Sequence, residues 1–425
     1  MFKVIKSKKN INPFGGIYFI NDTLSVRKVD KIIDRELGSR AINAEYSYSD
    51  GLKTLLFSQL CGGSCIEDIN AIREKFNTSG KIKLCSPDTI SVMSDELADT
   101  TWVYTTKRGI EHEINSNIKL NRLLSAVVKH TRLIKPGADN VMDYDNVVLP
   151  NEKKDSKRTY KHVEGYQPGV AFVNRLPVYV EGRNGNSPAK FMMEETLKSV
   201  FENIKGIRVK YFRSDCAAYQ EAVIEFLEER EELEFFIRIM SSPDLSYQIT
   251  TNVKSWEEIV INKQTMEVAS IDYCPFGGTK SYRVVVHRKK RNDGQVDMYS
   301  GTCYDYYGII TNNNTKTDGE VIDFYNQRAS IEPNFTYLNN DFNWNHLPFS
   351  WLSKNTVYML LSSVCFVLFE YIKKIYSGVL PFVTQSMRIK NFILNFIAIP
   401  VKWIRTARQD YLRVYSQKDY QPILS

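Results

Sequence analysis

The chain has 425 residues, of which 43% are hydrophobic and 25% are charged, with a net charge of +7. This composition is globular, allows several domains, and suits a polyanionic partner without requiring one. Seven cysteines without a CxxC pair and five scattered histidines indicate neither a disulfide framework nor a transition-metal site. The N-terminus lacks the apolar segment of a signal peptide, and the apolar run Val357 to Phe369 is shorter than the roughly 20 residues of a membrane-spanning helix. We therefore expect a cytoplasmic protein in which this run is a buried core helix.

Residues 1–136 show a helical pattern of apolar positions. Helices are expected at 25–37, 49–61, 66–76, 86–95 and 117–134. The fourth is opened by Ser86-Pro87, and the last is ended by Lys135-Pro136-Gly137. Short helices joined by tight turns are typical of helix-turn-helix DNA readers, and also of a plain helical bundle or dimerisation unit. Both interpretations stay open.

Beyond this break the periodicity becomes strand-like. Strands are expected at 141–149, 169–174, 176–181, 207–212 and 234–240, with helices at 187–204 and 217–229. Three strands, a helix, a strand, a helix and a strand is the order of a ribonuclease H-like α/β domain. We predict such a catalytic core in two parts, 137–240 and 301–348.

The segment 241–300 is interpreted as a β-rich insertion, with strands at 247–253 and 282–287 and a hairpin turn at 292–294. Trp256 within it is a candidate for stacking on an unpaired base or, more simply, a core residue. A basic run leads into the turn and is either a clamp for DNA phosphates or a solvated loop: Arg288, Lys289, Lys290 and Arg291. Residues 349–425 are expected to form a basic helical C-terminal region.

Three carboxylates occupy positions that this order of elements brings together. Asp145 lies in the first strand, Asp215 follows the fourth, and Glu332 lies on a late helix that begins at a Thr317 capping box. Oxygen ligands without His or Cys suit Mg²⁺ or Mn²⁺. Two such ions about 3.5 to 4 Å apart would serve phosphodiester chemistry. Taken singly, each acid has a plainer interpretation. Asp215 would be a helix N-cap, Asp145 a polar strand residue and Glu332 a surface charge.

Tyr325 and Arg328 precede Glu332 at spacings that place all three on one helix face. With this triplet, the sequence resembles the DDE transposases of bacterial insertion sequences, specifically the cut-and-paste group with the Tyr-x-x-Arg-x-x-x-Glu signature, and in particular the insertion sequence 1380 group. The resemblance covers most of the chain and rests on further blocks: Asn12-Pro13-Phe14-Gly15-Gly16, Met142-Asp143-Tyr144-Asp145, Gly165-Tyr166-Gln167-Pro168, Arg183-Asn184-Gly185-Asn186-Ser187, Phe212-Arg213-Ser214-Asp215 and Asn340-Asp341-Phe342-Asn343-Trp344.

The resemblance implies a transposase that cleaves phosphodiester bonds at the ends of its element and joins the freed 3′-hydroxyls to target DNA. Its implied metal ligands are Asp145, Asp215 and Glu332, with two divalent ions per active site, while Tyr325 and Arg328 would contact DNA phosphates. Asp143 is the rival of Asp145, because residues two apart on a strand face the same way; the family pattern favours the second acid. The implied partner is double-stranded DNA, both as the terminal inverted repeats, which region 1–136 would bind, and as the target. A second copy of the chain is implied as the partner in a synaptic homodimer. No membrane is implied, and the expected location is the bacterial nucleoid.

Two positions depart from the family pattern. Asn339 stands where the signature has Lys, so it can hydrogen-bond a phosphate without neutralising it. Pro333 follows Glu332 and disfavours helical geometry there. The alternatives are therefore a catalytically decayed DNA-binding protein derived from a transposase, and a ribonuclease H-like nuclease without strand transfer.

Overall fold

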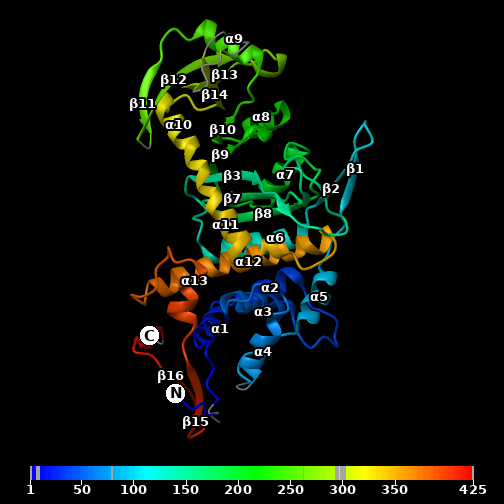
Figure 1. The fold of residues 1–425 in the computed structure, drawn as a ribbon, viewed down its shortest axis with the longest axis vertical. Helices are drawn as coiled ribbons and strands as arrows, with labels where there is room; N and C mark the ends of the chain where they lie inside the picture. Colours follow the sequence, from blue (N-terminus) through cyan, green and yellow to red (C-terminus); the bar gives the residue numbers. More distant parts are fainter. Residues whose placement is uncertain are drawn as a thin grey trace.

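A computed structural model describes residues 2–5, 10–77, 80–261, 263–291, 296 and 303–423. Its described part is built on an 11-stranded mixed sheet with the order β1-β2-β8-β7-β3-β9-β10-β14-β13-β12-β11. Figure 1 shows strands β11 to β14 of this sheet at one end of the long axis, its other strands in the middle, and a helical region, which contains both termini, at the other end.

The centre of the sheet is the predicted ribonuclease H-like core. Strands β8, β7 and β3 pair antiparallel, and β9 and β10 continue the sheet parallel to β3. The elements are β3 (Asn140–Asn146), β7 (Gly169–Val173), β8 (Leu176–Arg183), α7 (Met193–Asn203), β9 (Val209–Ser214), α8 (Glu221–Glu228) and β10 (Glu234–Arg238). Asn174 and Arg175 join β7 to β8 with positive φ of 47° and 73°, the conformation of a two-residue hairpin turn. The mixed α/β fold predicted for the core is confirmed.

The insertion extends this same sheet. Strand β14 pairs with β10, and β13, β12 and β11 follow by antiparallel pairing. The strands are β11 (Glu257–Ile261), β12 (Gln264–Tyr273), β13 (Tyr282–Lys290) and β14 (Tyr304–Thr311). The strand predicted at 247–253 was wrong: it is helix α9 (Pro243–Asn252), whose start is capped by the Ser242 hydroxyl, which accepts from Leu245 N at 3.1 Å. The predicted turn at 292–294 lies outside the described residues.

The N-terminal helices pack together beneath the core and share its hydrophobic interior. They are α1 (Gly16–Val26), α2 (Val29–Leu37), α3 (Tyr48–Leu60), α4 (Ile69–Asn77), α5 (Pro87–Glu96) and α6 (Ile118–Thr131). The helix expected at 25–37 is two helices, because Lys28 takes a left-handed conformation with φ of 58°. Between α5 and α6 the hairpin β1 (Trp102–Thr105) and β2 (Glu111–Asn115) joins the sheet at β8 and projects from the body (Figure 1).

Helix α12 (Leu352–Ser377) lies between strand β8 on one side and helices α3 and α5 on the other (Figure 1). Among the described helices it alone is long and apolar enough to span a membrane, and 89% of its most apolar stretch is buried inside the protein. The predicted buried core helix is thereby confirmed. It packs against α6 and β8, both of which carry buried apolar side chains toward it.

The C-terminal region is only partly helical. After α13 (Ile389–Phe392) the chain forms a hairpin of β15 (Val401–Thr406) and β16 (Gln409–Val414), so the prediction of a helical tail was wrong there. The residues of β15 are rich in β-branched and aromatic side chains, which favour strands. The backbone of Val401 also exchanges two hydrogen bonds of 2.8 Å with that of Asn12. This contact ties the tail to the N-terminus.

Candidate active site

Two of the predicted acids lie side by side at one edge of the sheet. Tyr144 of β3 pairs with Ser214 of the parallel strand β9. The next residues, Asp145 and Asp215, therefore occupy adjacent strand ends, as expected for parallel neighbours. Both carboxylates are half-buried. Asp215 also has the helix-capping role considered from sequence: its Oδ1 accepts from Ala217 N at 2.9 Å and starts a short 3₁₀ turn.

Asp143, the rival of Asp145, is fully engaged elsewhere. Its two oxygens accept from Nε and Nη2 of Arg213 at 2.7 and 2.8 Å, and both side chains are almost completely buried. The third guanidinium nitrogen of Arg213 donates to the backbone carbonyl of Phe324 at 2.7 Å. Asp143 therefore ties β3, β9 and helix α10 together, and its lone pairs are not directed at the site.

The Tyr-x-x-Arg-x-x-x-Glu pattern, predicted on one face of a single helix, is divided between two helices and the 3₁₀ segment Gln327–Ile331 that joins them. The predicted Thr317 capping box is present at the start of α10 (Asp318–Asn326), and the chain continues through a 3₁₀ segment into α11 (Glu332–Thr336) (Figure 1). Arg328 Nη2 lies 2.8 Å from Asp145 Oδ2, while its buried Nε has no hydrogen-bond partner among the described residues. Burial raises the pKa of the Tyr325 hydroxyl to about 12. Tyr325 is therefore a neutral donor beside a half-buried cation.

Glu332 keeps helical geometry, with φ of −55° and ψ of −43°, although Pro333 follows it. Pro333 stands in the first turn of α11, where its missing N–H costs little. The Glu332 side chain is exposed. Within the described residues no three Asp, Glu, His or Cys side chains are grouped to hold a metal ion. The structure thus brings Asp145 and Asp215 together and leaves Glu332 outside their cluster.

Asn339 lies in the turn that follows α11, and its Oδ1 is buried without a partner in the described part of the chain. The basic run of β13 is divided. Arg288 binds both oxygens of Glu267 at 2.7 Å, and Arg291 donates to Asp305 at 2.7 Å, whereas Lys289 and Lys290 are exposed. The two arginines therefore already have acidic partners within the protein.

Trp256, the possible base-stacking residue, is half-buried against the core. Its ring stacks on that of Tyr306, with 6.0 Å between centroids, and the Arg288 guanidinium lies over it at 4.4 Å. These contacts agree with the core interpretation.

The profile of one family, described as Transposase DDE domain group 1, matches residues 14–425. The chain belongs to this DDE transposase family. A similar solved structure is a cryo-EM structure of the piggyBac transposase synaptic complex with hairpin DNA, at 10% sequence identity and a TM-score of 0.44, covering 90% of this chain and 78% of that one. No curated protein matches the sequence.

In this DDE transposase family member, the chemistry of the two clustered acids suits a divalent cation. Burial first, and then the negative charge of Asp215, raise the pKa of Asp145 to about 6, and the charge of Arg328 opposes them. A cation between the two carboxylates would favour the ionised form of Asp145. Asp145 and Asp215 thus fit a metal ion, with oxygen donors only.

Several residues around the site were not found from sequence. Arg213 is the clearest, because its partner Asp143 lies on a different strand and only the strand pairing joins them. Arg238 and Cys216 line a hollow of about 480 Å³ beside the site, and Arg238 also lines a second hollow with Tyr325. The only sequence signal for these residues was their position at strand ends.

Proposed function

We propose that this protein is a DNA transposase of an insertion sequence, of the insertion sequence 1380 group and of bacterial origin. It binds terminal inverted repeats, hydrolyses phosphodiester bonds at the element ends, and joins the freed 3′-hydroxyls to target DNA. Its proposed partners are double-stranded DNA and a second copy of the chain in a synaptic dimer. The proposed location is the cytoplasm, at the nucleoid.

The observation that carries this proposal is the pair of adjacent carboxylates, Asp145 and Asp215, at the ends of parallel strands. These residues, with Glu332 as the third ligand, would hold Mg²⁺ or Mn²⁺. Bound divalent ions supply an activated water or 3′-hydroxyl and stabilise the leaving oxygen. Of the three, Glu332 alone has an exposed side chain.

Arg328 and Tyr325 are proposed to bind the DNA phosphate at the cut. The buried, unpartnered Nε of Arg328 is a donor that a phosphate oxygen would satisfy. The neutral Tyr325 hydroxyl can add a second donor. On the insertion, the exposed Lys289 and Lys290 are better placed for phosphates than the paired Arg288 and Arg291.

The test is incubation of the full chain with duplex DNA carrying the gene's own flanking sequences, with Mg²⁺ or with a chelator, and mapping of nicks at nucleotide resolution. Metal-dependent nicks at the borders of an inverted repeat are expected. Asp215→Asn should abolish them and leave end binding intact, because Asn can still cap the turn at Ala217. A matched control is Asp419→Asn, which alters an exposed Asp that caps another 3₁₀ turn, at Gln421. Retained cleavage in Asp215→Asn would remove this residue from the site.

A second candidate is a transposase-derived protein that binds DNA without cutting it. It is favoured by the exposed Glu332 and by Asn339 in place of the family's Lys. Specific end binding without metal-dependent nicks would support it. The substitution Asn339→Lys, which introduces the family's Lys, should recover cleavage if this position alone causes the loss. Cleavage should stay absent if other positions also contribute to the loss.

A further inference from the structure

The C-terminal hairpin of β15 and β16 turns one face to the body of the protein and the other to solvent. Opposite residues of an antiparallel pair share a face, and successive residues alternate between faces. Trp403 and Leu412 pair across the hairpin, and both pack against the hydrophobic core. The alternate positions therefore point away from the body. They form the outer face, which consists of Lys402, Ile404, Thr406, Gln409, Tyr411 and Arg413.

The hairpin is fixed to the N-terminal region. The Trp403 ring packs edge-on against that of Tyr18 in α1, with 5.3 Å between centroids. Asp410 forms an ion pair with Lys81, whose ammonium also lies over the Trp403 ring at 5.2 Å. Together with the backbone bonds of β15 to the N-terminal segment, these contacts hold the outer face in one orientation.

Two cations lie directly opposite each other on the outer face. Lys402 of β15 pairs with Arg413 of β16 in the register of the hairpin. Like charges in this position destabilise a pair of strands. Neither side chain has an ion-pair partner among the described residues, and the one acid of the hairpin, Asp410, is on the inner face and bound to Lys81. The described part of the chain therefore leaves this repulsion uncompensated.

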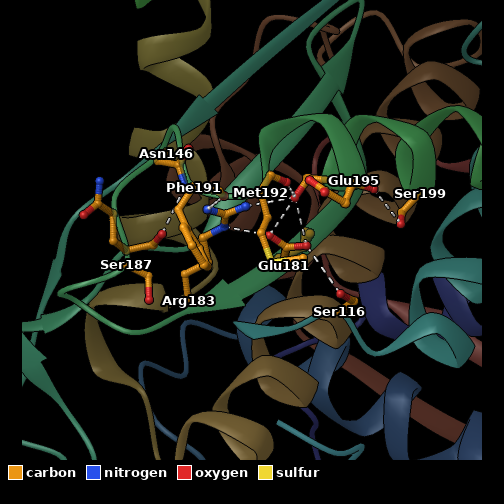
Figure 2. Close-up of polar contacts among 12 residues, drawn as sticks. Ser116, Asn146, Glu181, Arg183, Ser187, Phe191, Met192, Glu195 and Ser199 are labelled. Atoms are coloured by element: carbon orange, nitrogen blue, oxygen red, sulfur yellow. Dashed lines mark hydrogen bonds and ion pairs between the residues drawn. The ribbon is translucent and has the colours of Figure 1, made fainter. Parts of the chain in front are cut away.

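A buried cation of the core is arranged in the opposite way. Arg183 of β8 donates from Nε to Glu181 at 2.6 Å and from Nη2 to Thr196 Oγ1 at 2.9 Å, and both charges are buried. Figure 2 shows Arg183 and Glu181 joined in this network. Inside the fold the cation has an acid beside it, whereas the pair of Lys402 and Arg413 is left for an anion outside the chain.

The tip of the hairpin adds a third cation. Ala407 and Arg408 connect the strands with φ of 52° and 66°, the left-handed conformation that both positions of a type I′ turn require. Asparagine and glycine are the residues that usually take these positions. The Arg408 side chain is exposed. The turn therefore carries a guanidinium where a smaller residue would fold with less strain.

The outer face matches the backbone of duplex DNA. A two-stranded ribbon fits the major groove, which is about 12 Å wide, and Lys and Arg neutralise the phosphates along it. Thr406, Gln409 and Tyr411 add polar side chains of the kind that contact phosphates. An anionic membrane is a poorer match, because the one aliphatic side chain of the outer face, Ile404, is half-buried.

The hairpin is remote from the candidate active site. In Figure 1 it lies at the end of the long axis opposite β11 to β14, and the strands that carry Asp145 and Asp215 lie between the two. The helical region separates those strands from the hairpin (Figure 1). DNA that contacts both the site and the outer face must therefore run along the helical region beyond the cut.

We propose that the outer face binds the phosphate backbone of duplex DNA inside the element end, away from the cleaved bond. The inference rests on the proposed function and adds a second DNA contact to it, made by the C-terminal hairpin and independent of base sequence. Lys402, Arg408 and Arg413 each neutralise one phosphate. Bound DNA thereby supplies the anions that offset the repulsion between Lys402 and Arg413.

The test is the salt dependence of DNA binding. The full chain is titrated with the mapped end duplex at several KCl concentrations, without divalent ions so that nothing is cut. Lys402→Gln with Arg413→Gln should reduce the steepness of log K against log[KCl] by about 2, because each lost phosphate contact removes about 0.9. Adding Arg408→Gln should reduce it by about one more. The control, Lys31→Gln with Lys205→Gln, removes two exposed cations from other surfaces and should leave the slope unchanged.

Three further measurements separate this contact from a structural effect. The melting temperature of the double variant should be at least that of the parent, since a like-charged pair has been removed. On a duplex shortened to the base pairs next to the cut, parent and double variant should bind with equal slopes. A duplex of the original length with its internal sequence scrambled should retain the difference. If the double variant does not fold, Arg408→Gln alone serves, with an expected change of about 0.9.

An equal loss of slope on the shortened duplex would overturn the proposal. Binding of the parent to phosphatidylserine vesicles through these residues, with DNA binding unaffected, would assign the hairpin to a lipid surface instead. A parent that binds no end duplex refutes the proposed function as well. A parent that binds ends with a slope that the folded variants do not alter refutes the hairpin contact alone.

Discussion

Asp143 and Asp145 lie two residues apart on one strand, yet they should respond to mutation in opposite ways. Asp143 is bound through both oxygens to the buried Arg213. Removal of one member of a buried ion pair leaves an uncompensated charge and typically costs about 3–5 kcal/mol. Asp143→Ala should therefore be a stability mutation. Asp145→Ala should abolish metal-dependent cleavage instead.

The expected loss can be expressed as a melting temperature. Unfolding entropy of about 2.1 cal/mol/K per residue gives about 0.9 kcal/mol/K for 425 residues. A loss of about 3–5 kcal/mol then lowers Tm by about 3–6 °C. Thermal melts followed by circular dichroism measure this shift, and nicking by the same preparations at 20 °C measures activity.

The matched control removes both charges of the pair. Asp143→Leu combined with Arg213→Met should recover much of the lost stability, because no buried charge is left without a partner. Asp143→Ala protein that melts within about 1 °C of the parent but no longer cuts DNA would refute this assignment. Asp143 would then take the place of Asp145 as the metal ligand.

Three further predictions concern the same site. Burial and the charge of Asp215 raise the pKa of Asp145 to about 6 from its usual 3.8, so the folded state binds a proton that the unfolded chain releases between these values. Without metal, the free energy of unfolding should thus fall as pH rises from about 4 to 6. Urea denaturation should show a smaller fall for Asp145→Asn, and an equal fall in both proteins would contradict the raised pKa of Asp145. Arg328 competes with cations for Asp145, so Arg328→Ala should tighten Mn²⁺ binding in the absence of DNA by about tenfold. Calorimetry measures this affinity, and weaker Mn²⁺ binding by the variant would contradict the competition. Glu332 is exposed, so Glu332→Gln should change unfolding free energy by less than about 0.5 kcal/mol while abolishing nicking; retained nicking would remove it from the ligand set.

Much of the core could be predicted from sequence because its signals are local. Apolar and polar residues alternate in β3, and continuous apolar runs mark β7 and β8. Ser86-Pro87 and the Thr317 capping box mark two helix starts, and the 357–369 run marks α12. The helix α9 had such a signal in Ser242-Pro243, but the alternation of apolar residues at 247–253 also fits a strand. Local propensity could not decide between them.

Other features depend on contacts between distant parts of the chain. The hairpin of β15 and β16 joins the tail to Asn12, and the extension of the core sheet depends on β14 pairing with β10. The distinction between Asp143 and Asp145 depends on Arg213, which a spacing argument within one strand does not include.

The central claim, that this family member transposes DNA, is tested most directly by strand joining. Pre-cut end duplex with a labelled 3′-hydroxyl is incubated with the protein, Mg²⁺ and a supercoiled plasmid. The account predicts labelled ends covalently joined to the plasmid, and no joining with a 3′-dideoxy end or with Asp215→Asn protein. Metal-dependent nicking of uncut ends without any joined product would identify a nuclease and contradict the account.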